Sequence, residues 1–188
     1  MARNEEAIAA AGRFLRALGL DLAVLQMEKT PERVAEAYSH FFSGLTEDPA
    51  AVWGDLIRTE SKGLIAVRNI RFHSICEHHI LPFFGTVQIA YFPRNGKIAG
   101  FGHFADAVDI LARRPQLQER LTEEICRAVS TGVDTAGTLV IVKAKHLCLT
   151  MRNRAAADTE IVTTAADGML CEGTKLYDQA WSLLKEEE

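Results

Sequence analysis

The spacing of apolar residues changes along this chain from the period of a helix to that of a strand, and the change follows RTES at residues 58–61. Before it, apolar side chains recur at helical spacing over residues 5–18, and the Thr30–Pro31 pair is typical of a helix start. After it, residues 64–71 and 85–93 alternate or run β-branched and aromatic, as strands do. The chain is therefore expected to begin with helices and to continue into a sheet.

The later segments alternate between the two periods. We expect a helix ending near residue 42, a hairpin-type turn at 94–97 (RNGK), helices over 102–113 and from 115 onward, strands over 138–151 and 159–165, and a closing helix over 174–185. This order predicts an α+β fold with a largely antiparallel sheet. We place a helical extension in residues 1–50 and the sheet-containing domain in residues 51–188.

Composition narrows the classes of function. The 188 residues are 48% apolar and carry a net charge of −4, which argues against broad nucleic-acid binding. MARNEEAIAA has two glutamates where a signal peptide needs an apolar run, and no stretch approaches the ~20 apolar residues that span a bilayer. We therefore expect a cytoplasmic protein with no membrane or nucleic-acid partner, whose four cysteines serve metal binding or burial rather than disulfides.

One short stretch concentrates side chains that bind metals. FHSICEHHILPFFG, residues 72–85, holds one cysteine and three of the six histidines, and then turns apolar. Cys76 and His79 are separated by two residues, a spacing that lets both side chains converge on one ion around a tight turn. The plainer interpretation is that Cys76 is a small buried apolar residue, and that His78 and His79 are polar residues of a turn.

A second pair lies on the strand predicted over residues 138–151. Because side chains alternate across a sheet, His146 and Cys148 are expected to point the same way, about 6.5–7 Å apart. A lone pair of this kind is usually incidental. Beside the CEHH motif, however, it supplies a further ligand from a distant part of the chain.

Cys76, His79 and Cys148 together would offer two thiolates and one imidazole, which zinc prefers, and would leave a fourth position for water, as in catalytic sites. A closed structural zinc site needs a fourth strong ligand, and the sequence holds no second Cys-x-x-Cys or Cys-x-x-His pair. Cys126, on a predicted helix, and Cys171, near the C-terminus, are expected to be bystanders.

Four segments resemble the signature blocks of the GTP cyclohydrolase I family, in the order and separation of that family. They are TPERVAEAYSHFFSGL, SICEHHILPFFGTVQIAYFP, RRPQLQERLTEEI and AKHLCLTMR. The resemblance covers roughly residues 28–170, and the Cys-Glu-His-His and Gln-x-Gln-Glu-Arg-Leu blocks together are highly specific. There is no glycine fingerprint of a Rossmann fold and no P-loop.

The resemblance implies the tunnelling fold, in which an antiparallel sheet has helices packed on one side and the subunits form rings. Family members are typically homodecamers with active sites at subunit interfaces. They open the imidazole ring of GTP hydrolytically, release formate and form 7,8-dihydroneopterin triphosphate, a pterin on the route of tetrahydrofolate biosynthesis. Residues 51–188 would then be the catalytic domain.

The resemblance also implies roles for individual residues. Cys76, His79 and Cys148 match the zinc ligands of the family, and the Zn2+ ion activates a water molecule for attack on the purine C8. His78 and His146 match two histidines suited to moving protons during ring opening, because imidazole titrates near neutral pH.

Further matches concern the substrate. Gln118 and Glu119 match the residues that recognise the guanine edge. Without the resemblance, Glu119 would be assigned to a solvent-facing side of its helix, away from Leu117 and Leu121. Arg33 and Arg152 match basic positions of the phosphate pocket.

The likeness breaks at the phosphate and ribose region. Where the family reads approximately Gly-Leu-Ser-Lys-Leu-Ala-Arg, this chain reads GFGHFAD. Gly102 replaces the serine, His103 the lysine and Asp106 the arginine, so the pocket loses two positive charges and gains a negative one. His103 and Asp106 could pair with each other at positions i and i+3. The later segment IVTTAADGML is altered as well, which bears on the ring-closing steps.

Several interpretations remain open. The first is a cyclohydrolase acting on GTP, and the second applies the same chemistry to a less phosphorylated or unphosphorylated purine-like heterocycle in a specialised pathway. The third is a non-catalytic tunnelling-fold protein that uses zinc for structure or acts as a regulatory binder. Independently of these, the plainer interpretation of the changes over GFGHFAD is a surface helix that drifted. A thiol-dependent nitrile reductase of the same fold fits less well, because two cysteines and a histidine converging on one point indicate a metal.

Overall fold

The computed structural model describes residues 5–60, 63–153 and 156–185. The chain divides into two compact units, Met1–Ser43 and Gly44–Glu188, which we name the N-terminal unit and the main unit. The division lies a few residues before the one expected at residue 50. Within the described residues, no helix has the length and apolar character needed to cross a bilayer.

The N-terminal unit is a pair of packed helices, α1 (Glu5–Ala17) and α2 (Thr30–Phe41), as the sequence predicts. Lys29, rather than Thr30, occupies the N-cap position of α2, and no side chain caps this helix end. Pro31 lies in the first turn, where its missing N–H costs no intrahelical bond.

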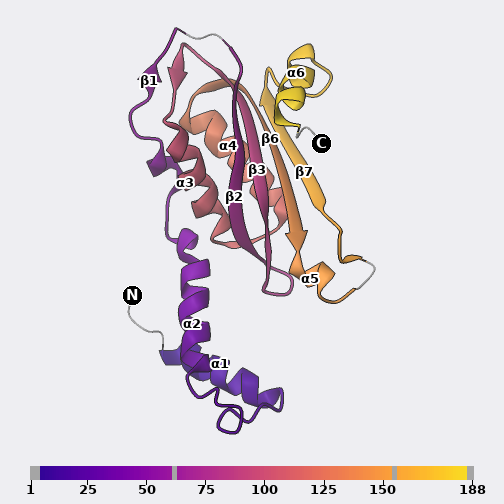
Figure 1. Cartoon of the computed structure of the whole chain (residues 1–188). Coiled ribbons are helices and arrows are strands. Elements are labelled where there is room, and N and C mark those ends of the chain that lie inside the picture. Colours follow the sequence, from indigo (N-terminus) through magenta and orange to yellow (C-terminus); the bar gives the residue numbers. More distant parts are fainter. Residues whose placement is uncertain (1–4, 61–62, 154–155, 186–188) are drawn as a thin grey trace. The chain divides into compact units, whose positions relative to one another are not determined.

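The main unit is built on a five-stranded sheet in the order β5-β2-β3-β6-β7 (Figure 1). The strands are β2 (Ile65–Cys76), β3 (Leu81–Pro93), β5 (Pro115–Gln116), β6 (Thr135–His146) and β7 (Ile161–Gly168). Neighbouring strands are antiparallel except for the short parallel pairing of β2 with β5. The prediction of an α+β fold with a largely antiparallel sheet is confirmed.

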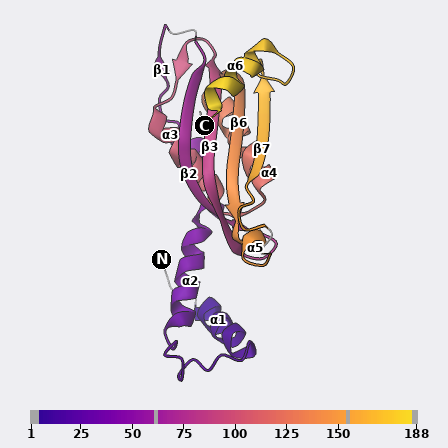
Figure 2. The same ribbon diagram turned by 45° about the vertical axis from the view of Figure 1, so that its right-hand side comes forward.

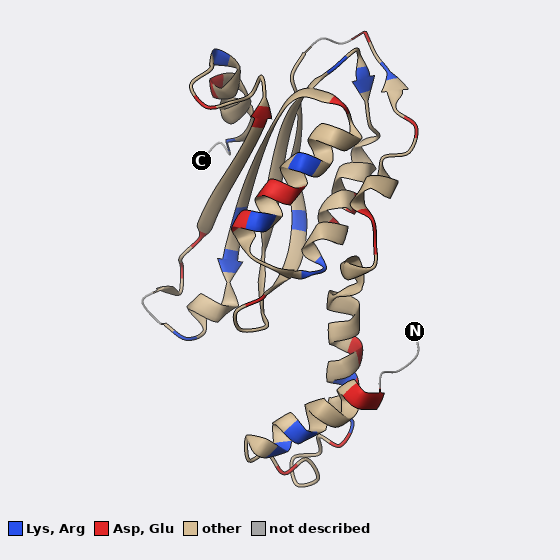
Figure 3. Ribbon diagram, turned by 180° about the vertical axis from the view of Figure 1, so that it is seen from behind, with Lys and Arg blue, Asp and Glu red and all other residues tan. Residues whose placement is uncertain are grey.

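Helices cover both faces of this sheet. The helices are α3 (Phe101–Ala112), α4 (Gln118–Gly132), α5 (Leu147–Thr150) and α6 (Lys175–Leu184), with short 3-10 turns at Ser43–Leu45 and Pro49–Val52. Figures 1 and 2 show α3 and α4 behind the sheet and α6 in front of it. In Figure 3, which views the chain from behind, α4 lies in front of the strands and carries both blue and red residues along its ribbon.

The alternation of side chains along β6 explains this arrangement. Val140 and Val142 are buried in the cluster under α3 and α4, whereas Leu139 and Ile141 pack in a second cluster with Ala180 and other residues of α6. The expectation that all helices lie on one side is therefore correct for α3 and α4 and wrong for α6.

The RNGK turn has the predicted geometry but a different role. The Lys97 N–H donates to the Arg94 carbonyl at 3.2 Å, and Asn95 and Gly96 both have positive φ. The strand that follows, β4 (Lys97–Ile98), pairs with β1 (Ile57–Arg58) and not with β3. The predicted turn is therefore present, and the partner of the strand that follows it is decided by the tertiary structure, since turn chemistry alone does not specify which edge that strand meets.

Two predicted boundaries need correction. The strand predicted over 138–151 ends at His146, and the next four residues form α5. The helix predicted from residue 115 begins at Gln118, because residues 115–116 form β5 beside the end of β2. The apolar run LCLTM at 147–151 fits either period, and Pro115 is as compatible with a strand edge as with a helix start, so tertiary pairing decides both structures.

Candidate metal centre and active site

The CEHH motif lies where β2 ends and the chain turns into β3. Cys76 is the last residue of β2, is 4% exposed, and pairs with Leu81 across the hairpin. The Ile80 N–H donates to the Cys76 carbonyl at 2.9 Å, and Ile80 adopts a positive φ of 55°. A β-branched residue in this conformation indicates a turn held in place by its surroundings.

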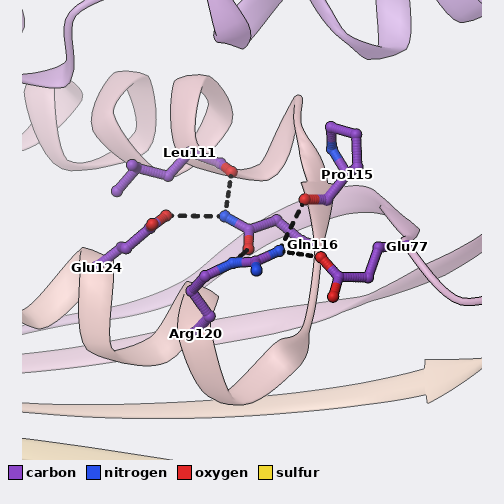
Figure 4. Close-up of polar contacts among 6 residues, drawn as sticks. All are labelled: Glu77, Leu111, Pro115, Gln116, Arg120 and Glu124. Atoms are coloured by element: carbon purple, nitrogen blue, oxygen red, sulfur yellow. Dashed lines mark hydrogen bonds and ion pairs between the residues drawn. The ribbon is translucent and has the colours of Figure 1, made fainter.

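A polar network fixes this turn to the start of α4 (Figure 4). An Arg120 Nη2 donor lies 2.5 Å from Glu77 Oε2 and also donates to the Pro115 carbonyl at 2.9 Å. Arg120 Nε donates to Gln116 Oε1 at 2.9 Å. Gln116 is 1% exposed, and its amide N–H groups donate to the Leu111 carbonyl and to Glu124. The turn that follows Cys76 is thus tied to the helix that carries Gln118 and Glu119.

Cys148 and His146 approach Cys76 from the end of β6. His146 is the last residue of that strand and stacks on Phe83, with ring centroids 4.5 Å apart and planes 6° apart. Cys148 lies in the short helix α5. One ligand atom each of Cys76, His146 and Cys148 lies within 4.8 Å of the other two.

This donor set suits a soft divalent cation. Burial raises the pKa of the Cys148 thiol, and the neighbouring Cys76 raises it further by accepting a hydrogen bond and by like-charge repulsion, whereas Arg152 lowers it. These surroundings favour the protonated form of the Cys148 thiol, whereas a zinc-like ion bound there would favour the thiolate and release a proton. Two sulfurs and one imidazole nitrogen are ligands that zinc accepts.

The electrostatics of His146 favour its neutral form. Burial lowers the pKa of this imidazole, and the carboxylate of Glu119 opposes that shift. Glu119 is exposed in the first turn of α4, close enough to act on His146. A neutral imidazole keeps one nitrogen lone pair available for a metal or a proton.

The predicted third ligand, His79, lies outside the described cluster. His79 is exposed, and its Nε2 atom accepts a hydrogen bond from Arg152 Nη1 at 2.6 Å. The sequence groups His79 with Cys76 and Cys148, whereas the structure groups His146 with them. His78 is exposed on the same turn, with its ring 6.2 Å from that of His79.

The structure also changes the interpretation of Gln118. Its side chain is 2% exposed, and both ends of its amide are engaged: Nε2 donates to Val142, Ile161 and Thr163, and Oε1 contacts His146 Nε2 at 2.8 Å. This placement contradicts a contact of the amide with the guanine edge. Glu119, by contrast, is exposed, so its carboxylate is accessible for a contact with the guanine edge.

His103 lies far from the cluster within one chain. Phe104, the next residue of α3, stacks on Tyr91, whereas His146 stacks on Phe83. Tyr91 and Phe83 are eight residues apart on β3, which corresponds to roughly 27 Å. The chain therefore does not bring its own His103 to its own Cys76.

Two further predicted residues have these placements. His103 Nδ1 lies 3.8 Å from Asp106 Oδ2. The two side chains therefore face each other, as their i and i+3 positions suggest, at a distance too long for a hydrogen bond. Arg33 is an exposed residue of α2 in the N-terminal unit.

Sequence reasoning missed the residues that support the site. Arg120 and Glu77 are 43 positions apart, and no local pattern predicts their ion pair. Gln116 was assigned to a helix start, although its strand pairing with Cys76 places its amide between α3 and α4. Each of these residues adjoins a residue that the motifs do single out.

Comparison with known proteins is consistent with this geometry. The family profile of GTP cyclohydrolase I matches residues 7–185. The chain is 45% identical to GTP cyclohydrolase 1 of Fusobacterium nucleatum over 160 residues, 85% of each chain, and 40% identical to that of Geobacillus kaustophilus over 172 residues, 92% of each chain. It is 41% identical to GTP cyclohydrolase 1 of Bacillus subtilis over 167 residues, 88% of each chain.

A more distant likeness is to the crystal structure of the archaeosine synthase QueF-Like in the apo form, with a TM-score of 0.49 and 23% identity over 58% of this chain and 97% of that one. The family profile and the relatives span most of the sequence, including both segments that supply the sulfurs and the imidazole. The chain belongs to the GTP cyclohydrolase I family.

Proposed function

We propose that this protein is a cyclohydrolase that opens the imidazole ring of GTP, releases formate and proceeds towards 7,8-dihydroneopterin triphosphate. The observation that carries the proposal is the convergence of Cys76, His146 and Cys148 on one point, in a chain whose relatives over most of its length are named GTP cyclohydrolase 1. Hydrolysis of a purine ring at neutral pH needs an activated water molecule, and this cluster offers a place to activate one.

Zinc is the metal we propose for this site. Two thiols and an imidazole fit it in softness and in number, and they leave room for a fourth ligand. When bound, the ion would supply Lewis-acid activation of water. The cysteines would hold it as thiolates after releasing their protons.

An experiment can decide which histidine supplies the imidazole ligand of the site. The family resemblance assigns this role to His79 and a proton-transfer role to His146, whereas His146 lies with the sulfurs in the structure. Zinc content should be measured in His79→Ala and His146→Ala, with exposed His73→Ala as control. Loss of zinc in His79→Ala alone supports the family assignment; loss in His146→Ala alone supports the observed cluster as the ligand set.

The other residues have separate proposed tasks. His78 and His146 would move protons during ring opening, and Glu119 would accept hydrogen bonds from the guanine N–H groups. Arg152 and Arg33 would attract the phosphates. Glu119→Gln should weaken binding of GTP more than it changes turnover of bound substrate, because it removes recognition rather than proton transfer.

A ring of subunits, such as a decamer, with sites completed at subunit interfaces is part of the proposal. The separation of roughly 27 Å between the two ends of β3 supports it, since His103 could contribute only to the site of another copy. Light scattering of the purified protein measures the subunit number directly. A monomer with full activity would exclude interface sites.

A second candidate function is the same ring-opening chemistry on a less phosphorylated heterocycle. His103 lies beside Asp106, and the pair replaces two cations of the family pocket with one titratable group and one anion. By Coulomb estimates, such a change in a partly desolvated pocket costs several kcal/mol of affinity for a triphosphate. The proposed substrate in this case is a guanine nucleoside, monophosphate or free base.

One assay separates these candidates. The zinc-loaded protein is incubated with GTP, GMP, guanosine and guanine, and formate and fluorescent pterin are measured separately. Pterin from GTP supports the first function, and formate from the smaller substrates supports the second. No formate from any of them would leave the non-catalytic binding protein. The cytoplasmic location expected from the sequence stays a prediction.

A further inference from the structure

We propose that Gln118 is a positioning residue that holds His146 as the tautomer protonated on Nε2, which leaves Nδ1 as its basic nitrogen. This inference deepens the proposed function. The position of the proton follows from the contacts of Gln118 and His146, and only the reaction in which Nδ1 takes part rests on the proposed function. It assigns the buried amide to the imidazole rather than to the substrate.

The orientation of the Gln118 amide follows from its acceptors. One end of the amide lies 3.1 Å from the Val142 carbonyl oxygen and 3.0 Å from the Ile161 carbonyl oxygen. Carbonyl oxygens only accept, so the group facing them must be the NH2 group. The reversed amide would put three oxygens together in a site that is 2% exposed, at a large desolvation cost.

Two threonine hydroxyls agree with this orientation. The Thr122 hydroxyl donates to the backbone carbonyl of Gln118 at 2.7 Å, so its 2.6 Å contact with Thr163 must use a hydrogen from Thr163. The Thr163 oxygen then has a lone pair for Gln118 Nε2, 3.1 Å away. The two hydrogens of Nε2 therefore face three acceptors, all on one side of the amide, and Oε1 of Gln118 is left facing His146.

The tautomer of His146 follows in turn. Gln118 Oε1 lies 2.8 Å from His146 Nε2, and an amide oxygen can only accept, so Nε2 carries the proton. The ring is held between Phe83 and this bond. A ring turned by 180° would present a carbon to Gln118 and lose the bond. Nδ1 is therefore the nitrogen with a free lone pair, as metal donor or as proton acceptor.

Such an arrangement resembles the hydrogen bonds that orient imidazoles at metal sites in general. Loss of a partner of this kind typically lowers activity or metal affinity by 10–100-fold, although the partner touches neither metal nor substrate. Gln118 reaches His146 from the first turn of α4, the helix that Arg120 ties to the CEHH turn. Helix α4 therefore holds both parts of the site, the CEHH turn through Arg120 and the imidazole of His146 through Gln118.

The direct test is spectroscopic. Solid-state NMR of the full-length protein labelled with 15N-histidine, with His146→Asn used to assign the resonances, reports which nitrogen is protonated. We expect a protonated, exchange-protected Nε2 and an unprotonated Nδ1 on His146. A proton on Nδ1, or on both nitrogens at neutral pH, would overturn the proposal, whether or not the protein opens GTP.

Variants supply a second readout. Gln118→Met keeps the volume and removes the acceptor, so we expect a 10–100-fold lower kcat with little change in KM, and loss of the Nε2 signature. Gln118→Glu restores an acceptor and should recover part of both. Thr163→Val removes one partner of Nε2 but leaves Oε1 on His146, and should lower stability without moving the signature.

The failures are distinguishable. A protein without formate release from any purine, but with the expected His146 signature, would end the proposed function and leave the positioning role standing. If Gln118→Met folds and retains wild-type kcat and tautomer, the positioning role is wrong. If it does not fold, the wild-type spectrum alone decides.

Discussion

Arg152 Nη1 donates a hydrogen bond to His79 Nε2 at 2.6 Å. Arginine has no acceptor, so the bond uses the lone pair that His79 would need to bind a metal through the same atom. The two partners are mutually exclusive at that nitrogen. The resemblance to the family assigns one of these residues to the metal and the other to the phosphates, and the structure joins them.

Removal of Arg152 should therefore tighten zinc binding if His79 is a ligand. A hydrogen bond worth about 1 kcal/mol corresponds to about a fivefold lower Kd in Arg152→Met. Competition with a chromophoric chelator measures it, and Arg71→Met, at an exposed arginine of β2, controls for the lost charge. Arg152 also lowers the pKa of the Cys148 thiol, so the comparison is repeated with His79 replaced by alanine. If Arg152→Met changes the Kd by the same factor with and without His79, then His79 Nε2 does not bind the metal.

Both sulfurs of the cluster should be necessary for metal binding. We expect about one zinc per chain in the purified protein, and none in Cys148→Ser, because a hydroxyl is a poor substitute for a thiolate. Cys171→Ser, at an exposed cysteine, should keep the metal. Elemental analysis checks both variants, and full zinc in Cys148→Ser would reject the ligand assignment.

The ion pair between Glu77 and Arg120 should couple the CEHH turn to α4. Both side chains are more than a third exposed, so a coupling energy of about 1 kcal/mol or less is expected. A double-mutant cycle of Glu77→Gln and Arg120→Gln, followed by urea unfolding, measures it. Additive effects of the two substitutions would show that this contact contributes nothing to stability.

Two glycines should respond oppositely to alanine. A Cβ at Gly85, where β3 pairs with β6, would lie 1.8 Å from the Lys143 carbonyl oxygen, which is backbone that cannot move aside. Gly102, in α3, has open space around it. We expect Gly85→Ala to abolish folding or cost several kcal/mol, and Gly102→Ala to stabilise the protein by about 0.5–1 kcal/mol. Thermal unfolding of the two variants compares them.

Alkaline pH should destabilise the fold through Tyr91. Burial raises the pKa of Tyr91 to about 12, above its ordinary value of 10.0. Below pH 10 both states hold the proton; between pH 10 and 12 the unfolded state ionises first, so the free energy of unfolding falls by up to roughly 2–3 kcal/mol.

Tyr91→Phe isolates that contribution. The hydroxyl has no hydrogen-bond partner among the described residues, so its removal should leave stability at pH 7 equal or higher. The variant should lose less stability between pH 10 and 12, as measured by urea unfolding. Cys126, whose pKa burial raises to about 11, stays in both proteins and contributes to the loss of stability that remains in the variant at alkaline pH. Identical pH profiles would contradict the assignment to Tyr91.

The order of elements could be predicted because hydrophobic period is a local property. The helices α1, α2, α3 and α6 and the antiparallel strands all follow from apolar spacing, and the CEHH motif marks one half of the site without any structure. Cys76 and Cys148 could be paired in advance because thiols are few and their chemistry is specific.

Contacts between segments distant in the sequence, by contrast, depend on how the elements pack. His146 and Cys148 were expected to lie together because side chains alternate along one strand, and that reason is wrong. The strand ends at His146, and Cys148 lies in α5, which places its sulfur near the imidazole. Packing between α4, β6 and β7 determines which imidazole lies beside the sulfurs. The same packing places Gln118 against His146. Sequence spacing encodes periodicity along one element, whereas these distances arise from how separate elements meet.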